Sequence, residues 1–108
     1  MTYGKLNASV PVLRKLVGQD LHLRQAYHLT KIAKKVNEEL VFFNTKYEEI
    51  VKSEASEEEK IKMMTELLNF DVPWDLVPLV LSPDTEITVS ASDLEAVRGL
   101  VEVDEKEE

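Results

Sequence analysis

The sequence predicts an α+β fold that is mainly helical. It would consist of a long antiparallel helical hairpin, preceded by a short N-terminal helix and followed by a small C-terminal β element with one short helix. Three observations support this. An apolar stripe with helical spacing runs without Gly or Pro over residues 21–51, a capping motif follows it, and prolines recur from residue 73 onward. At 108 residues the chain has the size of a single domain.

The longest expected element is an amphipathic helix from Leu21 to Val51, with Asp20 as its N-cap. A helix of about 30 residues is roughly 45 Å long, so its apolar stripe must be buried against the rest of the chain or against a partner. The stripe advances in heptad-like steps of 3, 4, 4, 3, 4 and 3. Its members are Leu29, Ile32, Val36, Leu40, Phe43, Tyr47 and Ile50.

A shorter helix is expected before the long one. Asn7 or Ser9 would cap it, and residues 3–6 would form a short strand or an extended lead-in. Pro11 suits the first helical turn, where its missing N–H costs nothing. Gly18 is expected just beyond the end of this helix.

A third helix is expected to follow the long one. Ser56 and Glu59 have the spacing of a capping box, and the helix would continue to about Asn69. The connection from Val51 is short, so the two helices should pack as an antiparallel hairpin. Because the third helix is about half as long as the second, part of the long stripe needs another cover.

Pro73, Pro78 and Pro83 recur every five residues and exclude helix over that segment. Residues 76–81 read as an extended apolar run, and Pro78 makes it an edge strand or an irregular one. Pro83-Asp84 is an expected turn, and residues 86–89 alternate as a short strand.

The C-terminal end is expected to hold one more helix and one more strand. Ser90 or Ser92 would cap the helix, and Gly99 would end it. Residues 100–103 would then form the last strand. The single domain, residues 1–108, therefore has a helical part over residues 7–69, a β-containing part over residues 70–103 and a charged tail over residues 104–108.

The charge is distributed unevenly. Residues 1–52 carry nine Lys or Arg and five Asp or Glu, a net charge of +4, and residues 53–108 carry four and sixteen, a net charge of −12, which sum to −8. The two halves would either neutralise each other in the fold or leave a negative surface for a basic partner.

The chain lacks the residue patterns of catalytic and metal sites. It has no Cys and no Gly-rich phosphate loop. His22 and His28 are six residues apart, so they do not form the i, i+4 metal pair. Adjacent glutamates on a helix point in different directions and cannot act as a dyad. We therefore predict no enzyme activity, no cofactor and no catalytic or metal site.

Two groups of residues are candidates for binding. Phe43, Tyr47 and Ile50 lie at the far end of the long stripe, and Trp74 either locks its loop onto the core or anchors a partner. The second group is a basic ridge that would contact phosphates, face solvent or pair with the acidic half. This ridge consists of Arg24, Lys31, Lys34 and Lys35, with His28 between them.

Several segments resemble a group of small uncharacterised proteins encoded by phages and prophages of Gram-positive bacteria. The resemblance implies a phage-type accessory protein and carries over no catalytic residue. The region of Trp74 and Pro78 and the short loop after Val51 depart from that group's pattern. The matching segments are Leu6-Asn7-Ala8, Pro11-Val12-Leu13, Leu16, Leu21-x-Leu23-x-x-Ala26-Tyr27, Lys31-Ile32-x-Lys34, Asn37-Glu38-Glu39-Leu40, Phe43-Asn44, Ile87 to Ser90, Ser92-Asp93-Leu94 and Val101-Glu102.

The expected function is therefore protein–protein interaction through the helical hairpin, in a virion, tail or assembly role. The partner is another protein or a second copy of the chain, which would make a homo-oligomer. One alternative is a small acidic inhibitor that mimics phosphate and blocks a host nucleic-acid-binding enzyme or defence system. Direct nucleic-acid binding through the ridge is disfavoured by the net charge of −8. With no apolar run of membrane-spanning length, the expected location is the host cytoplasm or the virion.

Overall fold

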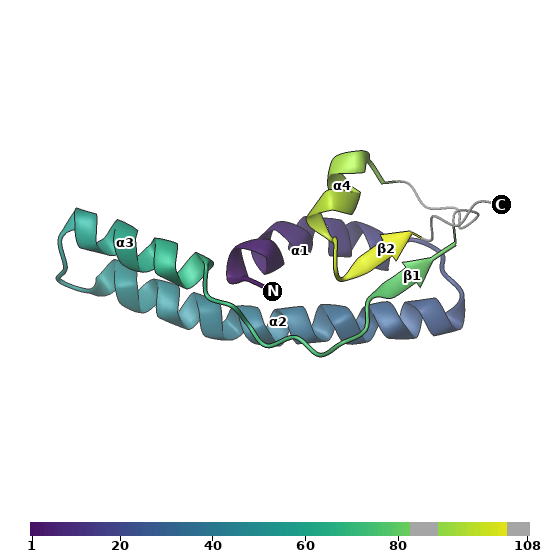
Figure 1. Ribbon diagram of the computed structural model, residues 1–108. Helices are drawn as coiled ribbons and strands as arrows, with labels where there is room; N and C mark the ends of the chain where they lie inside the picture. The colour runs from purple at the N-terminus through teal and green to yellow at the C-terminus, as the bar shows by residue number, and fades with distance from the viewer. Residues whose placement is uncertain (83–88, 104–108) are drawn as a thin grey trace.

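The computed structural model describes residues 1–82 and 89–103, and 65% of these residues are helical. The described residues form three longer helices, a two-stranded sheet and one short helix, arranged as in Figure 1. In chain order they are α1 (Tyr3–Val17), α2 (Leu23–Lys52), α3 (Glu57–Leu68), β1 (Leu79–Leu81), α4 (Ala91–Ala96) and β2 (Val101–Val103). The mainly helical class with a small β element is confirmed.

Helix α2 spans 30 residues and forms the long axis of the molecule (Figure 1). The predicted stripe is its buried face as far as Phe43, so the helical period correctly identified this face. The predicted N-cap was wrong. His22 holds that position without a side-chain hydrogen bond, two residues beyond Asp20. The five buried residues of α2 are Leu29, Ile32, Val36, Leu40 and Phe43.

Helix α1 begins earlier than the sequence predicted. The hydroxyl of Thr2 accepts a hydrogen bond from the backbone N–H of Lys5 at 3.2 Å, so Thr2 is the N-cap and residues 3–6 are helical. The expected strand or lead-in over residues 3–6, and the cap at Asn7 or Ser9, were wrong. Pro11 consequently lies inside the helix and not in its first turn. The predicted end beside Gly18 is confirmed.

The N-terminus is fixed to the segment that follows α3. The terminal ammonium lies 2.8 Å from a carboxylate oxygen of Asp71, and the backbone N–H of Val72 donates to the carbonyl of Met1 at 2.6 Å. Thr2 and Asp71 also form an isolated antiparallel bridge. These long-range contacts hold Thr2 in place at the start of α1, and nothing in the local sequence of residues 1–6 indicates them.

Helix α3 lies alongside the C-terminal part of α2 (Figure 1). Ser56 caps it as predicted, since its hydroxyl accepts from the backbone N–H of Glu59 at 3.2 Å. The ammonium of Lys60 donates to the carbonyl of Val51 at 3.1 Å, at the C-terminal end of α2.

The two strands are parallel and pair in the register Leu79–Val101, Val80–Glu102 and Leu81–Val103. A parallel pair needs a crossover, and here the intervening chain contains α4. The predicted capping box at Ser90 is confirmed, with Asp93 as its partner. Gly99 has φ 90° beyond the end of α4, a backbone conformation that favours glycine.

The strands predicted in the C-terminal part are confirmed only in part. Only Leu79–Leu81 of the expected run over residues 76–81 is a strand, and the last strand begins at Val101. Val89 is not in a strand. The rest of the expected strand over residues 86–89, the turn at Pro83-Asp84 and the tail over residues 104–108 lie outside the described residues.

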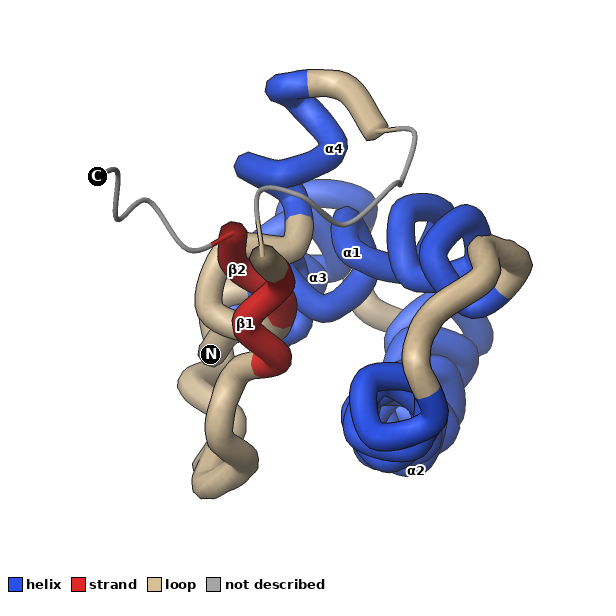
Figure 2. Tube along the Cα trace, turned by 90° about the vertical axis from the view of Figure 1, so that its right-hand side faces the viewer, coloured by secondary structure: helices blue, strands red, loops and turns tan. Residues whose placement is uncertain are grey.

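The molecule is elongated, with principal extents of 56 × 23 × 23 Å. Its radius of gyration is 16.3 Å, compared with about 13 Å for a compact domain of 100 residues. Figure 2 looks along α2 and shows the strands on one side of this helix, with α4 near α1. The buried core lies where α1, α2, β1 and the residues around β2 meet. The far part of α2 and α3 project beyond it as an arm, defined here as residues 41–70.

Candidate interaction surface

A column of three aromatic rings lies where the arm joins the core. Tyr3 of α1 is only 2% exposed, and its ring stacks on Phe42 of α2 at a centroid distance of 6.4 Å. The Tyr3 ring also stacks on Phe70, which follows α3, at a centroid distance of 6.0 Å. Both outer rings are open to solvent, Phe42 at 50% and Phe70 at 54%. The fold thus holds two half-exposed rings in fixed positions on a buried third ring.

The buried ring is also fixed at its polar end. The Tyr3 hydroxyl donates to Oε1 of Glu39 at 3.3 Å, and Glu39 accepts a second contact from Lys35 at 3.4 Å. Burial raises the pKa of the Tyr3 phenol above 10.0, and the charge of Glu39 and its hydrogen bond raise it further. The phenol therefore stays protonated and continues to donate to Glu39.

The aromatic column forms one wall of a groove between α2 and α3 with a volume of ≈ 430 Å³. Charged side chains lie along its edge. Lys46 is 5.5 Å from the centre of the Phe42 ring and 3.4 Å from Glu49. We call this the aromatic groove, and its apolar lining consists of Tyr3, Phe42, Ile50, Met63, Leu67 and Phe70.

The arm has much less burial than the core. Helix α3, which the structure describes in full, contains no buried residue, and no residue of α2 beyond Phe43 is buried. Helices as short as α3 depend on tertiary packing for their stability, and α3 has little of it within this chain. Because several apolar side chains of the arm are exposed, they remain available to a partner. Those that are exposed are Val41, Phe42, Tyr47, Val51, Ile61, Leu68 and Phe70.

The four predicted partner-binding residues do not form one surface. Phe43 is 7% exposed and packs between Tyr3 and Tyr47, at centroid distances of 5.4 and 6.1 Å. Tyr47 is exposed, whereas Ile50 is half-buried in the aromatic groove. Trp74 is half-buried and packs against the core, which is the loop-locking arrangement.

The predicted basic ridge is divided between different surroundings. Lys35 pairs with Glu39 of its own helix, and Lys31 lies 5.1 Å from the ring centre of Tyr27. Lys34 belongs to a groove between α1 and α2, whereas Arg24 is exposed. His28 between them has Nε2 2.8 Å from the carbonyl oxygen of Val77, so it fixes the segment before β1.

The amino-acid sequence does not indicate the three rings of the column as a unit. Phe42 is next to the stripe and not on it, Phe70 follows the expected third helix, and Tyr3 belongs to the expected strand or lead-in over residues 3–6. The one local signal is the pair of adjacent phenylalanines at residues 42 and 43. Only one ring of such a pair can point into the core, so the other must lie at its edge.

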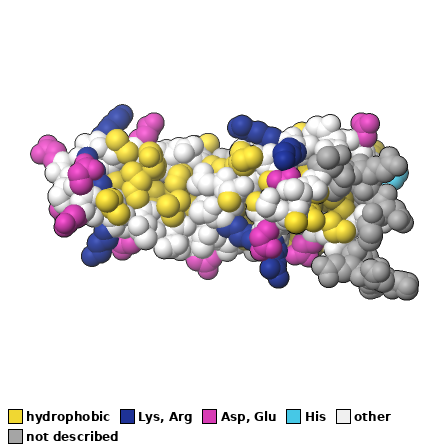
Figure 3. Space-filling model, turned by 90° about the horizontal axis from the view of Figure 1, so that it is seen from above, with side chains coloured by type: hydrophobic (Ala, Val, Ile, Leu, Met, Phe, Trp, Pro, Cys, Tyr) yellow, Lys and Arg dark blue, Asp and Glu magenta, His cyan; other side chains and the backbone are white. Residues whose placement is uncertain are grey.

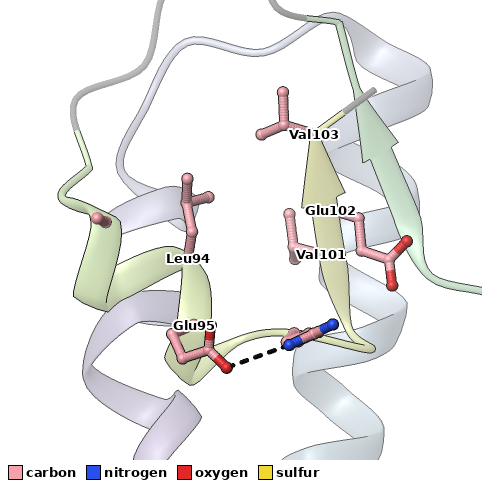
Figure 4. A pocket seen from close by; sticks show the side chains of 7 residues that line it. Leu94, Glu95, Val101, Glu102 and Val103 are labelled. Atoms are coloured by element: carbon pink, nitrogen blue, oxygen red, sulfur yellow. Dashed lines mark hydrogen bonds and ion pairs between the residues drawn. The ribbon is translucent and has the colours of Figure 1, made fainter. Parts of the chain in front are cut away.

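A separate hollow of ≈ 500 Å³ lies between α4 and β2 (Figure 4). Its two carboxylates, Glu95 and Glu102, do not converge on a common point. Leu94 and Val101 face the hollow, but Glu102 points away because side chains alternate along a strand. Glu95 instead pairs with Arg98 at 3.4 Å. Within the described part of the chain, no three His, Asp or Glu side chains are placed to share a metal ion.

The acidic residues are spread over several elements. In Figure 3 their side chains lie at both ends and both edges of the visible face, among Lys and Arg. Asp93 of α4 pairs with Lys15 of α1 at 2.8 Å, and this pairing together with the Ser90 N–H lowers the Asp93 pKa below 3.8. Asp71 pairs with the N-terminus. The basic and acidic halves therefore neutralise each other at these two places.

Searches against protein-family models, curated proteins and solved structures each gave no significant match. Over the described residues, no helix combines the length and the apolar content that a membrane crossing requires. The resemblance to phage-encoded proteins stays a prediction.

Proposed function

We propose that this protein acts without catalysis, by binding a protein partner through the helical hairpin of α2 and α3, with the aromatic groove as the anchor site. The observation that carries the proposal is the pair of half-exposed rings, Phe42 and Phe70, stacked on the buried ring of Tyr3. Aromatic residues in such partly desolvated positions supply most of the binding energy at many protein interfaces.

The aromatic groove also reduces the entropic cost of binding. The rings of Phe42 and Phe70 are already ordered by stacking on Tyr3, so a partner does not have to immobilise them. The groove accepts an apolar side chain, and Lys46 and Glu66 at its edge favour a partner with polar groups of both signs around that side chain.

The accessory role in a virion, a tail or an assembly process rests on the resemblance to phage-encoded proteins and belongs to this proposal. The alternative of a phosphate-mimicking inhibitor requires one continuous negative surface. The spread of carboxylates over α3, α4 and β2, with Lys and Arg among them, gives that alternative no specific support.

Affinity capture with the full chain tests the proposal. The wild type, a Phe42→Ala/Phe70→Ala variant and a Tyr27→Ala control are used as bait in lysates of infected or lysogenic host cells, followed by quantitative mass spectrometry. Tyr27 is an exposed aromatic outside the groove and serves as the matched control. We expect a partner that the wild type and the control retain and the double variant loses at least tenfold. Equal capture by all three proteins contradicts the proposal.

A further inference from the structure

A second groove lies between α1 and α2, with a volume of ≈ 730 Å³. Aliphatic side chains form most of its surface, and two of them are largely open to solvent, Val41 at 66% and Val17 at 57%. Its apolar lining consists of Val10, Leu13, Val17, Ala33, Val36 and Val41. We call it the aliphatic groove. An uncovered apolar groove of this kind is a usual site for an amphipathic helix.

The outward side of α3 carries a matching row of aliphatic residues. Ile61 is 65% exposed and Leu68 is 40% exposed, and Met64 lies with them beside Val51 of α2. This row, called here the α3 row, is separate from the aromatic groove, because the hollow that it lines shares no lining residue with that groove. The described residues contain no further element that covers it.

The lengths of the two surfaces agree. On α2 the aliphatic groove extends from Thr30 to Val41, which corresponds to about 16 Å along the helix axis. Helix α3 has 12 residues and is about 18 Å long. One copy of α3 can therefore occupy the whole groove of another copy.

One pair of charged residues from each of the two helices is complementary to the other pair in one orientation only. Lys34 and Glu38 lie in the aliphatic groove, four residues apart. Glu58 and Lys62 flank Ile61 in the sequence of α3, three residues before it and one after it, and they have the opposite order of charge. Within the described residues, neither pair forms an ion pair inside its own helix. A docked α3 that runs parallel to α2 brings Glu58 to Lys34 and Lys62 to Glu38, each step being about 6 Å.

We infer that the aliphatic groove is the binding site for the α3 row of a second copy of this chain. Donor and acceptor surfaces differ, so the contact is heterologous and each bound copy presents a free groove and a free row. Repetition of the contact produces a ring or an open chain of molecules. The elongated shape, with α3 at one end of α2, places the donor beyond the body of its own molecule (Figure 1).

This inference does not depend on the aromatic groove. A Phe42→Ala/Phe70→Ala variant should self-associate like the wild type, because neither ring belongs to the α3 row or to the aliphatic groove. Loss of partner capture and loss of self-association can therefore be measured separately.

Sedimentation velocity with two single-surface variants of the full chain tests the contact. Ile61→Asp removes the donor and Val41→Asp removes the acceptor, and both positions are exposed enough to leave the core intact. We expect the wild type to form larger species as its concentration rises and each variant alone to remain a monomer. An equimolar mixture should give a 1:1 dimer that does not grow, since each variant keeps one working surface. A monomeric wild type, or a mixture that stays monomeric, overturns the inference.

A charge exchange tests the register and needs no core substitution. Lys34→Glu/Glu38→Lys should weaken self-association about tenfold, and adding Glu58→Lys/Lys62→Glu to the same chain should restore it. Lys31→Glu, an exposed position outside the groove, is the matched control and should leave association unchanged. Failure of the second exchange to restore association, or an equal loss in the control, overturns the proposed orientation.

Discussion

At the scale of single residues, Tyr3 connects the features that matter most here. Its ring is buried, it stacks on Phe42 and Phe70, and its hydroxyl donates to Glu39. Such a residue stabilises the core and positions the exposed rings with one side chain. Its local sequence gives little indication of this role, because the partners are 36 to 67 positions away.

The Tyr3 phenol makes stability depend on pH at the alkaline end. Its pKa is raised above 10.0 in the folded state by burial and by Glu39. The folded protein then holds a proton that the unfolded chain loses, so the free energy of unfolding falls as the pH rises from about 10 through the folded pKa. Urea denaturation between about pH 8 and pH 11 should show this fall. The decrease should be smaller in Tyr3→Phe, and an identical pH profile would contradict the assignment.

The adjacent residues Phe42 and Phe43 should differ strongly in their effect on stability. Phe43→Ala removes a buried ring and should lower the free energy of unfolding by about 3–5 kcal/mol. Phe42 is 50% exposed, and Phe42→Ala should cost about 1–2 kcal/mol. Chemical denaturation of both variants measures the difference, with Phe43→Leu as a milder variant should the alanine variant not fold. Equal costs would contradict the placement of the two rings.

At the scale of elements, the apolar period and the capping residues predicted most of the helices. The stripe of α2, the end of α1 beside Gly18, the cap at Ser56 and the capping box at Ser90 follow from interactions within a few residues of one another. The start of α1 has a local cap as well, Thr2 with the N–H of Lys5, but local capping does not distinguish Thr2 from the candidates Asn7 and Ser9. Thr2 is held by contacts of residues 1 and 2 with Asp71 and Val72, which are distant in the sequence.

The position of Pro11 within α1 tests the early start of this helix. It lies inside α1, where a proline lacks the N–H that would donate to the preceding turn. Because Pro11 is exposed, Pro11→Ala restores this hydrogen bond without disturbing the core. We expect the free energy of unfolding to rise by about 1–3 kcal/mol. A thermal or urea denaturation curve that shows a loss of stability would instead place Pro11 at a helix start, as the sequence alone indicated.

At the scale of the whole molecule, the core and the arm differ in packing. The core unites α1, α2 and the strands, whereas α3 has no buried residue. The overall length of 56 Å follows from α2, which continues beyond the core and is accompanied there by α3. Of the three proposed binding surfaces, the aromatic groove and the α3 row are therefore on the arm, and the aliphatic groove is between α1 and α2.

Hydrogen exchange should reveal this division. Amide protons of α3 should exchange through local opening and show less protection than those of α1 and of residues 29–43 of α2. At concentrations where the protein self-associates, protection in α3 should rise, because docking covers the α3 row. Equal protection of α3 and α1 in the dilute monomer would contradict the low packing of the arm.

The sequence by itself determined the helical class, the buried face of α2, most helix ends and the location of the last strand. These features depend on periodicity, caps and prolines, which act over a few residues. Only the tertiary structure decided that Tyr3 joins Phe42 and Phe70, that Lys15 pairs with Asp93, and that the strands are parallel. The physical reason is that stacking, ion pairing and strand order depend on how distant segments pack, and helical or strand periodicity does not contain that information.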